Sequence, residues 1–223
     1  MKNHTKKVLL WLPCWSWYFS WQTVNSLLRL IKPLPCSVLI LERMRIEKAR
    51  NYIIEQAIQT DSDYVLMIDD DNPVSQDTLI KMLEDDKDIV IATILTRNPN
   101  KDWIHNICAY YKEERKIEKN GKTELLDYYE FVKEFDNTTK YLHKIDAWWA
   151  WCMLIKKKVF KKLWETYKWY PFEFWDITVN GQRRTTSEDV EFCERACKEW
   201  FEVRIDTRIR PIHLWNKQQI IYK

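Results

Sequence analysis

The sequence predicts an α/β fold: a single domain with a mostly parallel central sheet flanked by helices. Short apolar runs alternate with stretches of helical periodicity through the first hundred residues. This order is typical of a parallel sheet with helical crossovers. A length of 223 residues, with 46% hydrophobic and 31% charged residues, suits one soluble globular domain with a sizeable core.

The first half of the chain predicts four strands, each a short apolar run: Lys7–Leu12, Ser37–Leu41, Tyr64–Ile68 and Ile89–Leu95. Helices are expected between them. The first is Ser20–Ile31, ended by two prolines, with an apolar stripe at i, i+3, i+4 and i+7 formed by Val24, Leu27, Leu28 and Ile31. Such a stripe ordinarily faces the core.

The second helix takes its inner face from five apolar residues with helical spacing: Ala49, Ile53, Ile54, Ala57 and Ile58. A third helix is expected over Ser75–Glu84. Strands that are separated by single helices pair in parallel through right-handed crossovers. The first half is therefore expected to build the parallel part of the sheet.

The second half is more irregular. Its expected strands are Ile107–Lys112, Lys116–Glu118, Leu142–Ala147, Cys152–Ile155 and Val203–Ile205. Asn120-Gly121 is a turn signal, and a polar loop is expected around 180–186. One helix is expected near Lys157–Trp164, and another is expected to begin after Ser187 as N-cap and to run to about Trp200.

Composition limits the classes of partner. The net charge is +3 and no long basic block occurs, so nucleic acid is not an expected partner. The chain has 13 Trp and 11 Tyr but only 2 Gly. Aromatic rings suit stacking against sugars or bases, and they also suit an aromatic-rich core. Six cysteines without a Cys-x-x-Cys pair indicate core thiols in a reducing compartment.

The N-terminus imitates a signal peptide or anchor, because a basic start precedes the apolar stretch Val8–Trp21. Pro13, Ser16 and Ser20 interrupt this stretch, and it is too short to span a bilayer. We therefore expect a strand and a loop, and no transmembrane segment. A shallow contact with a membrane surface is the alternative, through Trp15, Trp17, Tyr18 and Trp21.

Three consecutive acids, Asp69, Asp70 and Asp71, follow the apolar run Tyr64–Ile68. They would lie at the carboxyl end of a strand, where open α/β sheets bind ligands. Clustered carboxylates repel one another, and a hard divalent cation relieves that repulsion. The triplet therefore predicts a metal site, and the alternative is an acidic, solvated turn.

Four motifs, taken in order, resemble the GT-A glycosyltransferases: Arg50-Asn51, Tyr64–Asp71, Asp146-Ala147 leading to Cys152–Ile155, and Ser187–Phe192. They are most similar to the small family-2-type enzymes that viruses and phages encode. The resemblance spans roughly residues 7–213. It implies one GT-A (Rossmann-like) domain over 1–223, with a nucleotide-binding half at 1–100 and an acceptor-binding half at 101–223.

The implied activity is transfer of a sugar from a nucleoside diphosphate sugar, UDP- or GDP-linked, to a hydroxyl group. The acceptor would be a glycan, glycolipid or glycoprotein. The expected location is the cytoplasm, which would be the host cytoplasm for a virus-encoded chain. By the resemblance, Mn²⁺ or Mg²⁺ would be bound by Asp71 and His213, with Asp69 near the ribose or the metal. The alternative for His213 is a surface histidine of the basic tail.

Donor contacts are implied for the loop after the first strand, Pro13-Cys14-Trp15, and for the nucleotide side of Asp69 and Asp70. Basic residues at Arg43, Arg45 and Arg50 are candidates for contact with the diphosphate or the base, and Asn51 would fix the loop through hydrogen bonds. Arg43 and Arg45 also fit a solvated start of a helix.

The implied catalytic pair is Glu188-Asp189, with Asp189 as the base of an inverting transfer and Glu188 as an acceptor contact. Acids in the first turn of a helix are also favoured by the macrodipole alone. Where related sequences carry glycines, this chain has Trp148-Trp149-Ala150-Trp151. The three indoles either form a platform for a sugar or narrow the pocket, and at least one is expected in the core.

Two other functions stay open. Glu42 with Asp69 and Asp71 would suit two-metal phosphoryl transfer in a nuclease or phosphatase, although no glycine follows Glu42. A non-catalytic carbohydrate-binding protein on the same fold would also explain the tryptophan-rich stretch.

Overall fold

In the part of the chain that the structure describes, the central sheet has seven strands in the order β2-β1-β3-β9-β4-β12-β7. Their bounds are β1 Val8–Cys14, β2 Cys36–Glu42, β3 Tyr64–Ile68, β4 Ile89–Ala92, β7 Leu142–Ile145, β9 Cys152–Lys156 and β12 Val203–Asp206. Five strands run in one direction, and β9 and β7 run antiparallel to their neighbours. The expected α/β class with a mostly parallel sheet is confirmed. The antiparallel strand β9 lies between β3 and β4, which the sequence did not indicate.

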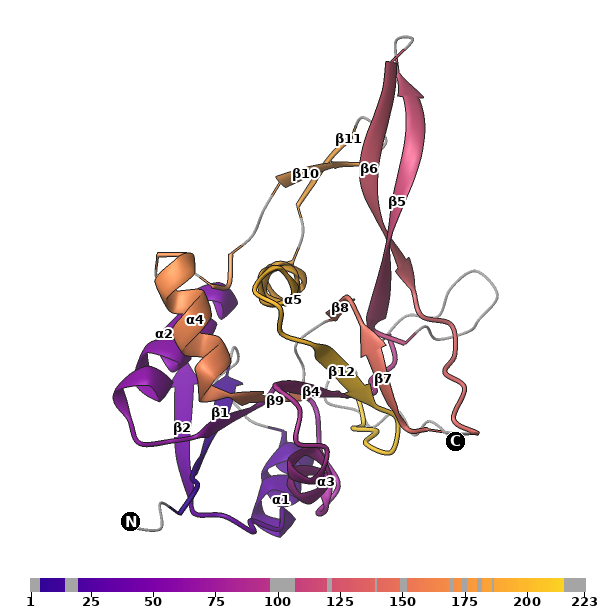
Figure 1. The fold of residues 1–223 in the computed structure, drawn as a ribbon. Coiled ribbons are helices and arrows are strands. Elements are labelled where there is room, and N and C mark those ends of the chain that lie inside the picture. Colours follow the sequence, from indigo (N-terminus) through magenta and orange to yellow (C-terminus); the bar gives the residue numbers. More distant parts are fainter. Residues whose placement is uncertain are drawn as a thin grey trace.

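The computed structural model describes residues 5–14, 20–96, 107–119, 122–138, 140–148, 152–168, 171–173, 176–179, 182–185 and 187–214. Among them are the helices α1 Trp21–Arg29, α2 Ile46–Gln59, α3 Thr78–Glu84, α4 Lys157–Thr166 and α5 Glu188–Lys198. Helices α1 and α3 lie on one side of the sheet, and α2, α4 and α5 lie on the other (Figure 1). The described part of the chain has no helix that is both long and apolar enough to cross a membrane.

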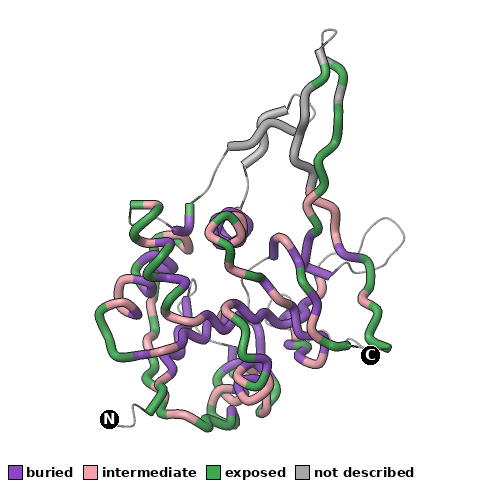
Figure 2. The backbone as a smooth tube through the Cα atoms, viewed as in Figure 1, coloured by how far each residue is buried: buried purple, intermediate pink, exposed green. Residues whose placement is uncertain are grey.

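Burial is concentrated in the central strands, and the long hairpin is mostly exposed where its side chains are described (Figure 2). Every residue of β1, β3 and β4 is buried. The predicted inner face of α2 is correct for Ala49, Ile53, Ile54 and Ala57, which are all buried. Continuous apolar runs therefore mark the strands that helices cover on both faces.

Helix α1 forms where it was expected but turns a different face inward. The residues that face the protein are Thr23, Ser26, Leu27 and Leu30. Of the predicted stripe only Leu27 packs against the core, while Val24, Leu28 and Ile31 are exposed. The observed inner face is the predicted one shifted by one residue, a rotation of about 100°.

Polar contacts explain this rotation. The Thr23 hydroxyl donates to the Asp70 carbonyl at 2.8 Å, and the Val74 N–H donates to the Ser26 hydroxyl at 3.2 Å. Ser20 caps the helix by accepting from the Thr23 N–H at 3.0 Å. The polar side chains Thr23 and Ser26 of α1 therefore form hydrogen bonds with the loop that follows β3, and most of its apolar side chains are exposed to solvent.

A long antiparallel hairpin projects from the body (Figure 1), formed by β5 Ala109–Lys119 and β6 Lys122–Phe131. β5 also pairs with the short β8 Ala147–Trp148. A second small ribbon is formed by β10 Asp176–Val179 and β11 Gln182–Thr185. The charged stretch expected between two strands is part of β5, and β6, β10 and β11 were not predicted. In β5 the exposed charged run 113–116 replaces the apolar alternation of a half-buried strand, so its sequence gives a weak strand signal.

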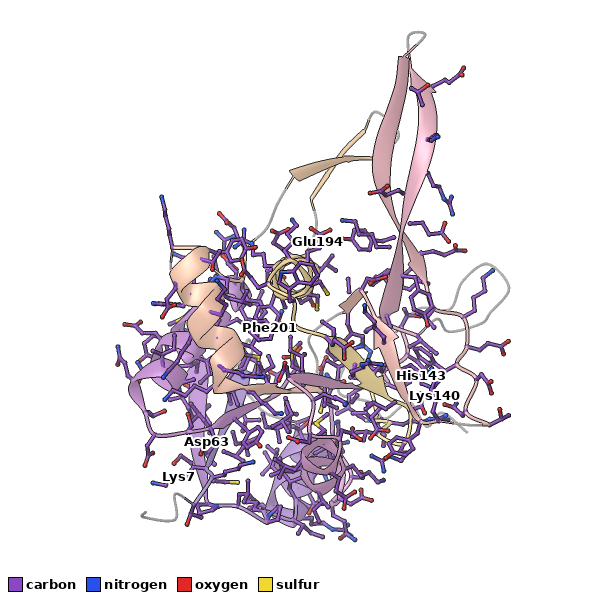
Figure 3. The ribbon with its side chains drawn as sticks, in the orientation of Figure 1. Lys7, Asp63, Lys140, His143, Glu194 and Phe201 are labelled. Carbon is purple, nitrogen blue, oxygen red and sulfur yellow. The ribbon has the colours of Figure 1, made fainter. Side chains whose placement is uncertain are left out.

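Helix α5 holds the base of the hairpin. Glu194 points from α5 toward it (Figure 3), where its carboxylate accepts a hydrogen bond from the Tyr129 hydroxyl and lies 3.3 Å from the Lys112 ammonium. The ring of Tyr110 packs against Phe131, with centroids 4.6 Å apart, and edge-on against Tyr129, with centroids 6.3 Å apart. These contacts fix the hairpin to the same helix that begins with Glu188 and Asp189.

Candidate functional site

A cavity of about 320 Å³ lies at the carboxyl ends of β1 and β3. Its wall is formed by Pro13, Cys14, Leu41, Met44, Ile46, Asp69, Asp70 and Asp71. Five residues that were predicted to bind the sugar donor or the metal therefore line one cavity. Pro13 and Cys14 belong to β1 itself and not to the loop expected after it, because pairing with β2 continues to Cys14. Trp15 lies outside the described residues.

The acidic triplet is held in a tight turn. The Asn72 N–H donates to the Asp69 carbonyl at 3.2 Å, and the Asn72 side-chain amide donates to the Asp71 carboxylate at 2.5 Å. Thr23 fixes the Asp70 carbonyl from the side of α1. The direction of the Asp71 carboxylate is therefore set by its neighbour, which is fully buried.

His213 lies beside Asp71, with 3.7 Å between its Nε2 and the Asp71 Oδ2. The chain around it runs along the triplet loop, because Leu214 N–H donates to the Asp71 carbonyl and Ile212 N–H to the Pro73 carbonyl. The Nδ1–H of His213 faces the Leu95 carbonyl at 3.3 Å. Metal-binding histidines ordinarily donate their second ring N–H to such a carbonyl. His213 is buried, so the alternative of a surface histidine is wrong.

The side chains that could bind a metal ion at this point are the Asp71 carboxylate and the His213 imidazole. Within the described residues, no three His, Cys, Asp or Glu side chains are grouped closely enough to hold a metal ion. Mg²⁺ and Mn²⁺ sites in phosphoryl and glycosyl enzymes need only one or two protein ligands, since water and substrate phosphates complete the shell. Ligands that share an octahedral shell lie about 3 Å apart, and the Asp71–His213 separation is close to this. The pair therefore fits a divalent cation.

Arg50 connects the triplet to the acids of α5. It extends from α2, is 2% exposed and forms an ion pair with Glu188. Its guanidinium nitrogens also lie 3.7 Å from Asp69 Oδ2 and 3.7 Å from Asp189 Oδ2. One buried positive charge thus faces three carboxylates. We expected Arg50 to contact the diphosphate, but its guanidinium is engaged by carboxylates.

Burial raises the pKa of Asp69 to about 7, against the opposing effect of Arg50, and the neighbouring Asp70, Glu188 and Asp189 raise it further. Burial also raises the pKa of Glu188, while Arg50 lowers it and Asp189 raises it. In both cases burial has the largest effect, and neighbouring carboxylates add to it against the single charge of Arg50. An additional cation beside these carboxylates would oppose both shifts.

The remaining donor candidates have different surroundings. The Asn51 amide donates to the Phe172 carbonyl at 2.6 Å and accepts from the Phe172 N–H at 3.0 Å, so Asn51 ties α2 to the segment after α4. Arg43 is exposed at the end of β2, and its backbone N–H donates to the Cys14 carbonyl at the cavity wall. Arg45 is exposed and paired with Glu47.

Glu188 and Asp189 begin α5 and are both buried. Ser187 occupies the N-cap position as predicted, but its side chain makes no capping hydrogen bond, and α5 ends at Lys198 rather than Trp200. The Asp189 carboxylate accepts from the Val190 N–H at 2.9 Å. The two acids expected to face the acceptor are thus brought to the Arg50 cluster.

The expectation of a tryptophan platform is wrong for Trp148, which is fully buried in the core and offers no ring face to a sugar. The expectation that at least one of the three indoles packs in the core is confirmed. Trp149 and Trp151 lie outside the described residues. Glu42, the extra acid of the phosphoryl-transfer alternative, is exposed and does not line the cavity.

Four residues that support the site were missed: Thr23, Met44, Asn72 and Phe172. Thr23 had one usable signal, since Ser20-x-x-Thr23 places two hydroxyls on one side of a helix start. Met44 and Phe172 act through shape and backbone groups, and these leave no pattern in the sequence.

Comparisons with known proteins support the fold. No protein-family model matches the chain, and no curated protein matches it. Among solved structures, 119 chains match. A197 from STIV superposes with a TM-score of 0.56 at 12% identity, over 95% of this chain and 87% of that one. TarS 1–349 from S. aureus gives a TM-score of 0.48 at 15% identity, over 96% of this chain and 59% of that one. The likeness to A197 shows a shared fold, and it agrees with the mixed α/β, Rossmann-like architecture described above.

Proposed function

We propose that this protein is a metal-dependent glycosyltransferase. It would move a sugar from a nucleoside diphosphate sugar to a hydroxyl group on a glycan, glycolipid or glycoprotein. The observation that carries the proposal is the meeting of three predicted groups at one edge of the sheet. These are the acidic triplet in the cavity wall, His213 at 3.7 Å from Asp71, and the Glu188-Asp189 pair joined to Asp69 through Arg50. The order of the four motifs supports a family-2-like enzyme.

The cavity suits a nucleotide. Its volume of about 320 Å³ is within the range of small-molecule sites. Leu41, Met44 and Ile46 give it an apolar wall for a flat base, and the triplet gives it an acidic end. A diphosphate would be repelled by bare carboxylates, so binding at the acidic end requires a cation between them.

Asp71 and His213 would hold that cation. Because Mg²⁺ strongly prefers oxygen ligands, the imidazole nitrogen favours Mn²⁺. When bound, the metal supplies Lewis-acid stabilisation of the departing diphosphate. Asn72 orients the Asp71 carboxylate, and the Leu95 carbonyl orients the His213 ring, so this chain sets both ligands before any donor binds.

Asp189 is the proposed base, which would remove the proton of the acceptor hydroxyl during an inverting transfer. Its side chain is 5% exposed in this conformation. The acceptor therefore reaches Asp189 only after a local rearrangement of the chain that covers it. Arg50 keeps the carboxylate next to Asp69, on the donor side of the site.

The test is turnover of UDP- and GDP-sugars by the full chain with Mn²⁺, followed as release of the nucleoside diphosphate. Asp71→Asn and Asp189→Asn should each reduce turnover at least about a hundredfold, because metal binding and proton removal are lost separately. Asp136→Asn is the matched control, since Asp136 is an exposed loop residue, and it should behave as wild type. Unchanged turnover in both site variants would refute the site assignment.

Donor binding can be measured without turnover. UDP or GDP with Mn²⁺ should raise the melting temperature of the wild type, since a ligand at a hundred times its Kd stabilises by about 2.7 kcal/mol. Asp71→Asn should remove the part of the shift that depends on Mn²⁺. A shift that is the same with and without Mn²⁺ would contradict metal-linked donor binding.

A further inference from the structure

Helix α1 presents an apolar face to solvent. Its members are Trp21, Val24, Leu28 and Ile31, and Trp21 and Leu28 are 69% and 76% exposed. The next element along the chain, the edge strand β2, adds the exposed side chains of Val38 and Ile40. We call these six residues the α1 face. Scattered exposed apolar residues need no explanation, but three on one side of a nine-residue helix, with Ile31 just after its end, mark a contact surface.

The segment of the chain that forms the α1 face carries charge of one sign, and Asp77, which follows the Gln76 contact of Ile31, is paired with Lys81. Residues 1–41 contain five Lys or Arg and no Asp or Glu, whereas the whole chain has a net charge of only +3. Two of the cations, Arg29 and Lys32, are exposed at the end of α1, next to the apolar side chains. The α1 face is therefore apolar with a basic margin.

We propose that the α1 face docks on the surface of an anionic lipid bilayer, with α1 lying in the plane of the interface. A helix that carries Trp and Leu on one side and cations at its margin is suited to this position. The nine residues of α1 span about 14 Å, less than half the hydrocarbon thickness, so α1 lies on the bilayer and does not cross it. A second copy of this chain would bring like charges together, which disfavours self-association.

Docking would also position the candidate site. The inner side of α1 is bonded to the triplet loop through Thr23 and Ser26, which contact Asp70 and Val74. Helix α1 would lie between the bilayer and this loop, and a helix is about 10 Å thick. The cavity with Asp69–Asp71 would thus be held close to the lipid head groups, where a membrane-bound acceptor is presented.

The experiment is co-sedimentation of the full chain with two kinds of vesicle, phosphatidylcholine alone and phosphatidylcholine with about one third phosphatidylserine. The wild type should bind the vesicles that contain phosphatidylserine, and the binding should weaken with added salt. Trp21→Ser with Leu28→Ser should lower the partition at least about tenfold, because two exposed apolar side chains no longer enter the interface. Both changes are on the surface, and an unchanged melting temperature verifies the fold.

The matched control is Trp200→Ser, since Trp200 is 93% exposed and lies after α5, away from the α1 face. It should bind vesicles as the wild type does. Equal binding by the control and the α1 variant would overturn the proposal, and so would a wild type that fails to bind. A dimer seen by light scattering that the α1 variant abolishes, without any vesicle binding, would also overturn it in favour of self-association. Asp71→Asn should still bind vesicles, so this result is separable from that of the transferase test.

Discussion

The positive charge of Arg50 offsets the repulsion among the three buried carboxylates of the candidate site. It is nearly inaccessible to solvent, and its guanidinium faces Asp69, Glu188 and Asp189. Each carboxylate is kept from repelling the others mainly by this one charge. The residue-scale consequence is that Arg50 is needed for stability as well as for the geometry of the site.

Arg50→Met should lower the free energy of unfolding by about 3–5 kcal/mol, because it leaves buried carboxylates without their cation. Urea denaturation measures this loss. Arg45→Met provides the control: Arg45 is exposed and pairs with a single acid, so its loss should be within about 0.5 kcal/mol. Similar losses for the two variants would show that Arg50 is not the buried counter-ion.

A second carboxylate pair lies away from the cavity. Asp85 and Asp206 have fully buried side chains and share Arg208, whose Nη2 lies 2.9 Å from Asp85 and 2.8 Å from Asp206. Burial and the neighbouring Asp206 raise the pKa of Asp85 to about 7 from its ordinary 3.8, while Arg208 acts in the opposite direction. The native protein therefore keeps a proton on Asp85 that the unfolded chain releases.

The sign of the pH effect follows from this. The stabilisation from the bound proton is complete below pH 3.8 and is lost by about pH 7. Between these values Asp85 should lower the free energy of unfolding by up to about 1.4 kcal/mol per pH unit, and Asp69, whose pKa is also raised to about 7, adds a slope of the same sign. Asp85→Asn replaces the carboxyl with an amide that does not titrate, so it should remove the Asp85 part of the slope. Urea denaturation across this pH range would contradict the assignment if wild type and variant gave parallel curves.

At the scale of elements, α1 shows where periodicity misleads. Its apolar stripe predicted the wrong inner face, because the loop after β3 offers a carbonyl and an N–H that Thr23 and Ser26 satisfy. Leaving those two groups without these partners would cost about 1–3 kcal/mol each, which opposes the gain from burying two further apolar residues. The apolar side chains left outside are the same ones that form the α1 face.

Two adjacent substitutions test this orientation. Thr23→Val keeps the shape but removes the hydrogen bond to Asp70, and should cost about 1–3 kcal/mol because the acceptor loses its partner. Val24→Thr changes an exposed residue and should be neutral within about 0.5 kcal/mol. Thermal unfolding of both variants measures the two losses of stability. If the predicted stripe faced the core, Val24→Thr would destabilise the protein more than Thr23→Val.

The hairpin β5–β6 depends on α5 in the same way. Glu194→Gln weakens the contacts with Tyr129 and Lys112, so hydrogen exchange should accelerate in the hairpin while the central sheet stays protected. Glu202→Gln removes an exposed ion pair with Arg204 and should leave the hairpin unchanged. Equal exchange in the hairpin of both variants would rule out Glu194 as its anchor.

At the scale of the molecule, the site is assembled from segments far apart in the chain. Thr23 and Asp70 are separated by 47 positions, and Arg50 and Glu188 by 138. The parallel strands β1 and β3 bring two of these segments to one edge, and the chain after β12 returns to it with His213. Insertion of β9 between β3 and β4 pairs the second half with the first in one sheet.

The sequence by itself determined the strands β1 to β4, most helix positions and the choice of the acids and histidine that meet at the candidate site. These depend on local apolar runs, strand ends and the order of motifs, and all three can be read directly from the sequence. Only the tertiary structure decided which side of α1 is buried and that Arg50 pairs with carboxylates. It also decided that Trp148 lies in the core and that β5 and β6 form a projecting hairpin. Each of these depends on a partner distant in the sequence, and such a partner leaves no local pattern to read.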